Sequence, residues 1–216
     1  MLRFYMKKIS QIVLAIGISC AGTAQANPSD DFFRAVAADN SSAMLTLLLR
    51  GFDPNTRDPR GQVALYLALR EGSLKVVDAL LADPQTRVDL ANGAGETPLM
   101  MAALRGQLAQ AKRLAAKGAQ LNREGWTPLH YAASGPGTEV AQWLLEQGAA
   151  IDAPSPNGST PLMMAARHAP EATVDLLLAR GADASRRNEQ GLAAADFARM
   201  AGREALAERL GRPAPR

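Results

Sequence analysis

A four-residue motif recurs along this chain at intervals of thirty to thirty-three residues. Thr127-Pro128-Leu129-His130 is preceded thirty residues earlier by Thr97-Pro98-Leu99-Met100 and followed thirty-three residues later by Thr160-Pro161-Leu162-Met163. Each copy has a glycine two residues before its threonine and an Ala-Ala pair soon after the motif. A fixed period of this length indicates a structure assembled from similar units, each of which buries its apolar face against its neighbour.

Glycines extend this register beyond the three motifs. Their successive spacings are 34, 30, 33 and 33 residues, at Gly61, Gly95, Gly125, Gly158 and Gly191. Leucine pairs recur in step with them, and the pair Leu47-Leu48 indicates a further, degenerate unit ahead of the first glycine. The repeated register therefore runs from Pro28 to Leu210.

The motif has the composition expected at the start of a helix. Pro98 fixes a helical φ and lacks an N–H that would be unpaired there, while Thr97 can cap the helix. Apolar residues then follow at helical spacing, so one face of each helix is predicted to be buried between units. Gly-Ala pairs such as Gly118-Ala119 supply the left-handed residue that ends a second helix. Each unit is thus predicted to hold two helices and an extended turn.

These residues resemble the ankyrin-repeat family, whose unit of about 33 residues is a β-turn finger followed by two antiparallel helices. The resemblance implies an all-α repeat fold, an ankyrin solenoid of stacked helix-turn-helix units with β-turn fingers, over residues 27–216. It implies about five to six units. We expect degenerate caps at 28–57 and 186–211, because neither end keeps a Thr-Pro-Leu turn.

Residues 1–26 have the pattern of a secretory signal peptide. Arg3, Lys7 and Lys8 form a basic start, an apolar run covers 9–18, and Ala24-Gln25-Ala26 is a small-x-small cleavage site. The apolar run is too short to span a bilayer. We expect cleavage after Ala26 and a periplasmic location, and the chain resembles periplasmic ankyrin-repeat proteins of Gram-negative bacteria.

Two alternatives stay open for this segment: an uncleaved anchor, and lipid attachment at Cys20, although Gly17 stands where a lipoprotein signal has a leucine-like residue. Cys20 is the single cysteine, so cleavage would leave no disulfide.

The 24 lysines and arginines exceed the 21 acids by three, and the three basic residues of segment 1–26 account for that excess. The remaining chain is nearly neutral, which argues against nucleic acid as a partner.

No combination of residues indicates catalysis. His130 and His168 are the only histidines, so the usual zinc ligands cannot be assembled, and we expect no metal and no cofactor. In the ankyrin family the histidine at the place of His130 joins neighbouring units through hydrogen bonds. His168 is expected near a turn and exposed, and the pairs Met100-Met101 and Met163-Met164 are expected in the core. The chain is therefore not expected to be an enzyme.

The resemblance implies a non-catalytic protein-interaction scaffold that binds through its concave surface of fingers and first helices. Outward positions of this surface flank the glycines and end the first helices. They fall on Arg57, Arg60, Gln62, Arg70, Glu71, Glu96, Arg105, Arg123, Trp126, Arg167 and His168. The arginines favour a protein partner with an acidic surface, and we expect a monomer without a membrane span after cleavage. Two alternatives are an accessory protein of a periplasmic enzyme such as a catalase, and a toxin-immunity protein.

One unit departs from this regularity. Only seven residues separate Gly118 from Gly125, where the corresponding glycines elsewhere, such as Gly148 and Gly158, are ten apart. The finger of that unit should therefore lack its tip. Trp126 follows directly and is either an exposed anchor for a partner or an ordinary loop residue packed on its neighbours.

Overall fold

The computed structural model describes residues 27–212, in which twelve helices form six consecutive pairs. The predicted signal segment 1–26, with Cys20, lies outside the described residues. The first helices are α2 (Pro28–Ala37), α4 (Ala64–Glu71), α6 (Pro98–Leu104), α8 (Pro128–Ala132), α10 (Pro161–His168) and α12 (Ala194–Met200). The second helices are α3 (Ser41–Leu49), α5 (Leu74–Ala82), α7 (Leu108–Ala116), α9 (Glu139–Glu146), α11 (Glu171–Ala179) and α13 (Glu204–Gly211).

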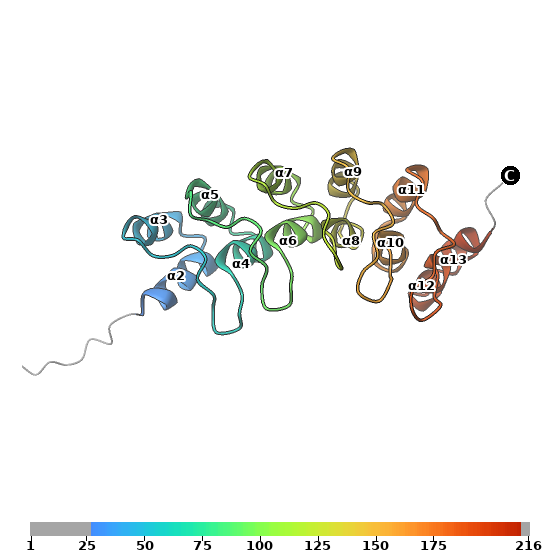
Figure 1. Ribbon diagram of the computed structural model, residues 1–216, viewed down its shortest axis with the longest axis horizontal. Helices are drawn as coiled ribbons and strands as arrows, with labels where there is room; N and C mark the ends of the chain where they lie inside the picture. Colours follow the sequence, from blue (N-terminus) through green and yellow to red (C-terminus); the bar gives the residue numbers. More distant parts are fainter. Residues whose placement is uncertain (1–26, 213–216) are drawn as a thin grey trace, which may run out of the picture.

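The helix pairs stack into an elongated solenoid, and we number them as units 1 to 6 along the chain. Figure 1 shows α3, α5, α7, α9 and α11 in one row, the first helices in a second row, and the connecting loops extending beyond the second row as fingers. Across the described residues the only β-type pairing is an isolated bridge between Arg57 and Val63. The predicted all-α repeat architecture is confirmed.

The core is continuous from unit to unit and consists mainly of leucine, alanine and valine. Leu99, Leu129 and Leu162, the leucines of the three motifs, are fully buried, as is Leu114 on α7. Small residues follow them on the first helices, so adjacent first helices can pack closely. Met100, Met101 and Met163 also fill this core, being 1%, 5% and 1% exposed, and Met164 packs against it while only partly buried.

Helix ends follow the sequence rules closely. The Thr97 side chain accepts a hydrogen bond from the Met100 N–H at 3.3 Å, with Pro98 in the first turn of α6. After α7 the chain turns through Gly118 at φ +94°, a conformation that glycine adopts without steric cost. Second helices therefore end where the Gly-Ala pairs predict.

The predicted role of His130 is confirmed. Its Nδ1 accepts a hydrogen bond from the Thr127 N–H at 3.2 Å, so its Nε2 carries the proton and donates to the Ser159 carbonyl oxygen of unit 5 at 3.0 Å. In units 3 and 5 the sulfur of Met100 or Met163 accepts the equivalent threonine N–H, but a thioether has no proton to donate onward. Unit 4 is thus tied to its successor by a bond that a methionine cannot make.

Four fingers end in a closed turn, and the finger of unit 4 does not. In unit 5, for example, the Ser155 N–H donates to Ser159 O at 2.9 Å and the Gly158 N–H donates to Ser155 O at 2.8 Å. The described residues contain no such pair of bonds between Ala119 and Thr127. The connection between α7 and α8 is correspondingly short in Figure 1. The predicted loss of one finger tip is confirmed.

The missing tip interrupts a row of bonded fingers. The Gly93 N–H donates to Gly61 O at 3.2 Å between the fingers of units 2 and 3, and the Glu189 N–H donates to Asn157 O at 3.0 Å between those of units 5 and 6. Across the described chain, no backbone hydrogen bond links finger tips on the two sides of unit 4.

Residues 27–212 contain no helix long and apolar enough to cross a bilayer.

Candidate functional site

Unit 4 is reduced at both ends of its first helix. Helix α8 has five residues, whereas α6 has seven and α10 has eight. After α8 the chain carries Ser134 and Gly135 where the same register places Leu104-Arg105 on α6 and Arg167-His168 on α10. A Cβ on Gly135 would lie 3.1 to 3.2 Å from three backbone carbonyl oxygens, so close packing against unit 3 requires glycine here. Unit 4 therefore lacks the long side chains that units 3 and 5 carry at the end of the first helix.

Trp126 stands at the finger end of α8 and borders a small apolar hollow. The hollow has a volume of about 200 Å³ and is lined by Leu104, Trp126, His130, Tyr131 and Ser134. The indole meets the rings of His130 and Tyr131 edge to face, with centroids 5.2 and 6.5 Å apart, and stays 37% exposed. Trp126 therefore packs against two aromatic neighbours and stays partly open to solvent.

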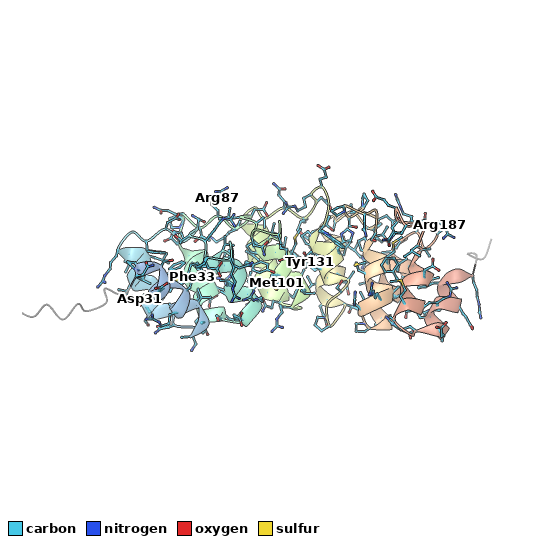
Figure 2. All side chains as sticks on the ribbon, turned by 90° about the horizontal axis from the view of Figure 1, so that it is seen from below. Asp31, Phe33, Arg87, Met101, Tyr131 and Arg187 are labelled. Atoms are coloured by element: carbon cyan, nitrogen blue, oxygen red, sulfur yellow. The ribbon has the colours of Figure 1, made fainter. Side chains whose placement is uncertain are left out.

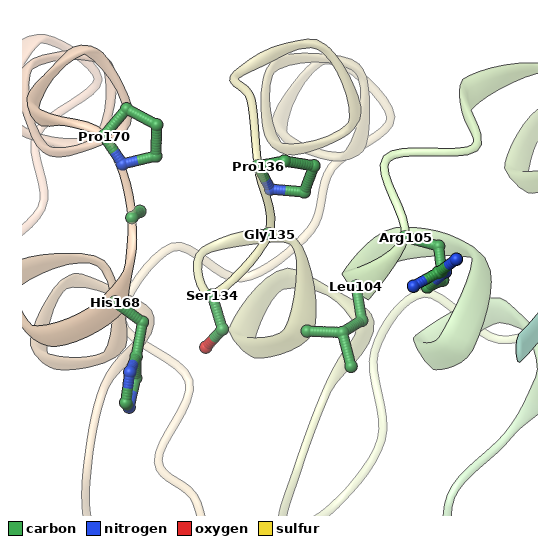
Figure 3. Close-up of a pocket in the computed structure, with 8 residues that line it drawn as sticks. Leu104, Arg105, Ser134, Gly135, Pro136, His168 and Pro170 are labelled. Atoms are coloured by element: carbon green, nitrogen blue, oxygen red, sulfur yellow. The ribbon is translucent and has the colours of Figure 1, made fainter.

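A wider groove lies at the other end of α8. It has a volume of about 550 Å³, and Arg105 and His168 stand on its opposite sides. Figure 3 shows Leu104, Ser134 and His168 along one side of this groove and Pro136 and Pro170 along the other, contributed by units 3, 4 and 5. Leu104 and Ser134 also line the apolar hollow, so the hollow and the groove are continuous.

A third depression occupies the place of the missing finger tip. It has a volume of about 620 Å³, and its lining includes Arg123, Glu124, Gly125 and Pro156. Gly125 precedes Trp126 directly in the sequence, although this depression shares no lining residue with the apolar hollow. We call the three together the unit 4 furrow: the finger gap at Arg123, the Trp126 hollow, and the groove between Arg105 and His168.

Glu96 is held in a hydrogen-bond network that joins three consecutive units. Its carboxylate accepts from the Tyr66 hydroxyl at 2.6 Å, the Tyr131 hydroxyl at 2.9 Å and the Asn92 side-chain amide at 2.8 Å. Burial raises the pKa of the Glu96 carboxyl, but these hydrogen bonds and the charge of Arg70 outweigh it, and the pKa lies below its ordinary value. Burial and the Glu96 charge raise the pKa of both tyrosines. Glu96 is thus a negative charge whose acceptor positions are largely used.

The structure divides the predicted binding residues into two groups. Arg57 donates to Gly61 O at 2.8 Å and to Ala91 O at 2.7 Å, so its guanidinium joins two fingers. Arg70 and Glu71 bond to each other at 2.9 Å. Gln62 accepts from the Asn92 amide at 3.1 Å, and Glu96 is bound as described. Binding by these residues stays a prediction, but their polar groups already have partners within the chain.

The second group has polar groups available. Arg60 is exposed at the tip of the unit 2 finger. Four others, Arg105, Arg123, Trp126 and His168, line the unit 4 furrow, and Arg167 is exposed beside His168 on α10. Burial and the neighbouring Arg167 lower the pKa of His168. The structure therefore places four of the eleven predicted residues in the unit 4 furrow and a fifth, Arg167, beside it.

Sequence reasoning missed Tyr66, Asn92 and Tyr131 as partners of Glu96. Tyr66 and Tyr131 occupy neighbouring positions in the register, Tyr66 aligning with His130 rather than with Tyr131. The two tyrosines belong to the units on either side of Glu96, and their presence could be seen in the sequence. Nothing in the residues around each tyrosine indicated its contact with Glu96.

In residues 27–212 no group of three or more His, Cys, Asp or Glu could hold a metal ion.

Comparison with known proteins identifies the class of this solenoid. The family of ankyrin repeats in three copies matches residues 32–124 and 112–188. The chain belongs to the ankyrin-repeat family, whose repeats form protein-interaction scaffolds.

Among its relatives, the ankyrin repeat and SAM domain-containing protein 6 of Rattus norvegicus is 34% identical over 111 residues, or 50% of this chain and 12% of that protein. The neurogenic locus notch homolog protein 4 of Homo sapiens is 46% identical over 95 residues, or 42% of this chain and 5% of that protein. An ankyrin repeat protein of Rickettsia felis is 36% identical over 138 residues, or 58% of this chain and 61% of that protein. This chain thus spans less than two thirds of each of these relatives.

A solved structure resembles this solenoid more completely. It is the complex of a predatory endopeptidase from Bdellovibrio bacteriovorus with an immunity protein, one chain of which matches with a TM-score of 0.70 and 27% identity. The match covers 83% of this chain and 96% of that chain.

Proposed function

We propose that this protein is a non-catalytic scaffold, exported to the periplasm, that binds a partner protein through its concave surface. The observation that carries the proposal is the unit 4 furrow, where Trp126 lies exposed among arginines. Aromatic and arginine side chains that lie near the centre of an interface tend to dominate its binding energy.

The comparison with the Bdellovibrio complex favours one form of this function. An endopeptidase and an immunity protein occupy that complex, and the match extends over almost the full length of one of its chains. We therefore propose, as the more specific candidate, that this protein binds and restrains an exported enzyme in the manner of an immunity protein. The other candidate, an accessory role for a periplasmic enzyme such as a catalase, rests only on the sequence resemblance.

The location is tested by cell fractionation. Osmotic shock should release the protein, and sequencing its N-terminus should begin at Asn27. Intact Met1 in the cytoplasmic fraction would contradict export. Retention in the membrane fraction would favour one of the two open alternatives, an uncleaved anchor or lipidated Cys20.

The binding function is tested by purifying the tagged protein from periplasm, identifying the bound protein by mass spectrometry and measuring its affinity. Trp126→Ala should weaken binding by about 2 kcal/mol or more if the indole is a central contact. Arg60→Ala and Arg105→Ala should mainly slow association and make it less dependent on salt. Unchanged affinity in all three variants would contradict binding through the concave face. An exported peptidase among the bound proteins would support the immunity candidate, and its inhibition in an activity assay would establish it.

A further inference from the structure

The unit 4 furrow crosses the concave face from the finger row to the turn between α8 and α9. Its three parts share residues or adjoin in sequence: Leu104 and Ser134 line both the groove and the hollow, and Gly125 in the finger gap precedes Trp126. Three independent reductions create it, namely the absent finger tip, the five-residue helix α8 and the small residues Ser134 and Gly135. The groove and the hollow form one continuous track, and the finger gap adjoins the hollow along the chain at Gly125.

The track changes chemistry along its length. At the turn end, Arg105 projects from unit 3 and His168 from unit 5, on the two sides of Gly135 (Figure 3). In the middle, Leu104, Trp126 and Tyr131 make the surface mainly apolar. At the finger end, Arg123 and Glu124 face the gap. The track therefore has a cationic end, an apolar centre and a mixed end.

The cations of this track are available for a ligand. Arg105 and Arg123 make no ion pair and no side-chain hydrogen bond with any residue in the described part of the chain. By contrast, Arg57, Arg113 and Arg203, which lie elsewhere on the solenoid, bond to carbonyl or carboxylate oxygens. The acid nearest to the apolar centre, Glu96, already accepts three hydrogen bonds. Charge complementarity thus favours a carboxylate at the turn end.

We propose that the unit 4 furrow binds one extended segment of the partner protein, seated across the repeat axis, with an apolar side chain in the Trp126 hollow and a carboxylate between Arg105 and His168. This inference rests on the proposed function and specifies the chemistry of the partner. The carboxylate is an Asp or Glu side chain, and the apolar residue inserts between Leu104 and Tyr131 beside the partly exposed indole.

The dimensions of α8 set the spacing of the two side chains. Five helical residues rise about 7.5 Å, and an extended chain covers that length in about two residues. Side chains on one face of an extended segment alternate with a period of two. The apolar and acidic residues should therefore stand two positions apart, and a spacing of one or three should bind poorly.

The test is a selection of short random peptides displayed on phage against the purified chain, followed by affinity measurement on the synthesised winners. Enriched peptides should share an apolar residue and an acid at the stated spacing. Arg105→Glu and Trp126→Ala should each weaken binding of the best peptide at least tenfold. Ser134→Arg should do the same by filling the furrow with the residue that α4 and α10 carry at this position, at Arg70 and Arg167.

Matched variants lie outside the furrow. Lys112→Glu, on the exposed side of α7, reverses a charge and is the match for Arg105→Glu. Leu49→Ala, at the end of α3, truncates an apolar side chain that is 88% exposed and is the match for Trp126→Ala. Neither should change peptide affinity. Thermal melts should show that all five variants remain folded, since none of the substituted side chains is part of the buried core.

The inference is overturned if no peptide is enriched, if enriched peptides lack the acid, or if their affinity is the same in the furrow variants and in the matched variants. The proposed function still holds after such a result if the periplasmic partner binds the protein and if Arg60→Ala, or another substitution on the concave face, weakens that binding. The proposed function fails separately when the identified partner is insensitive to every concave variant. A self-associating chain, detected by sedimentation and abolished by Ser134→Arg, would assign the furrow to a second copy and overturn the proposal.

Discussion

Units 4 and 5 share one core and present two different surfaces. Leu129 and Leu162 occupy the same register position and are both fully buried, as are Leu144 and Leu177 on the second helices. Yet unit 5 has a closed finger and an eight-residue first helix, while unit 4 has an open finger and a five-residue one. The stacking core thus tolerates losses on the concave side, because the residues that vary there do not contribute to burial between units.

The comparison also separates two ways of joining units. Unit 4 uses an imidazole that accepts from its own Thr127 and donates to Ser159 of unit 5. Unit 5 uses the sulfur of Met163, which accepts a threonine N–H at 3.4 Å and makes no bond to unit 6. Unit 4, which lacks a finger tip, is joined to unit 5 through its imidazole. Unit 5 is joined to unit 6 without such an imidazole, by the bond from the Glu189 N–H to Asn157 O and by the Arg203 guanidinium, which donates to Ala169 O.

The largest expected effect tests whether the two cores are equivalent. Leu129→Ala and Leu162→Ala should each lower the free energy of unfolding by about 2–5 kcal/mol, through lost burial and the cavity left behind. Lys112→Ala on the surface of α7 should cost little. Urea melts followed by circular dichroism measure all three. A small loss for Leu129→Ala beside a large one for Leu162→Ala would show that unit 4 is not part of the common core.

The next effect concerns the close packing of unit 4 against unit 3 at Gly135. Gly135→Ala should cost about 1–3 kcal/mol, because the added methyl would press on the carbonyl oxygens of Ala103, Leu104 and Ala132, which belong to helices and cannot move aside. Gly137→Ala is the matched control, since its methyl would meet only the flexible carboxylate of Glu139. Equal melting temperatures for the two variants would contradict this account of Gly135.

A smaller effect is expected when unit 4 is given the link of its neighbours. His130→Met should cost about 1 kcal/mol, because the sulfur can replace Nδ1 as acceptor but no donor remains for the Ser159 carbonyl. That carbonyl keeps the Ser155 N–H, which limits the cost. Denaturant midpoints at neutral pH measure the loss, and a gain in stability would show that the imidazole link is not favourable.

The same variant should alter the pH dependence of stability. Burial lowers the pKa of His130 in the folded chain, and hydrogen bonds to its ring only partly oppose this. In the unfolded chain the histidine pKa is about 6.5, so the unfolded chain binds more protons than the folded chain. The contribution of His130 to folding stability is therefore complete above about pH 6.5, the unfolded pKa, and declines as the pH falls through it. His130→Met should flatten the loss of stability between about pH 7 and 5. Leu49→Ala, which removes an exposed side chain that does not titrate, is the control, and an unchanged pH profile in His130→Met would contradict the assignment.

The smallest effect on stability is expected from restoring the finger. In this graft, residues 119–126 are replaced by residues 149–159, the corresponding segment of unit 5, which ends just before Thr160. The graft should change the free energy of unfolding by less than about 1 kcal/mol, since a longer surface loop adds little entropy cost. The graft should nevertheless abolish partner binding, because it removes Trp126 and closes the gap. Strong binding by the grafted protein would show that unit 4 surface irregularity has no functional role.

Much of the fold could be predicted from the sequence. The starts of α6, α8 and α10 follow from Thr-Pro, as at Thr97-Pro98, and the ends of α3, α7, α9 and α11 follow from a glycine such as Gly118, because both are local backbone preferences. The missing finger tip was evident from a count of residues between Gly118 and Gly125. The pairing of Arg57 with Ala91, and of Glu96 with two tyrosines, could not be foreseen, because those partners are thirty or more residues apart.

The sequence by itself determined the repeat register, the buried leucines, the bridging histidine and the unit in which the regularity fails. These depend on short-range preferences and on a period that places equivalent residues on one face. Only the tertiary structure decided that the open finger, the short α8 and Gly135 lie along one furrow, and that Arg105 and His168 stand on opposite sides of its groove. The reason is geometric: the stacking of successive units sets which side chains from different units share a surface, and no local pattern encodes those distances.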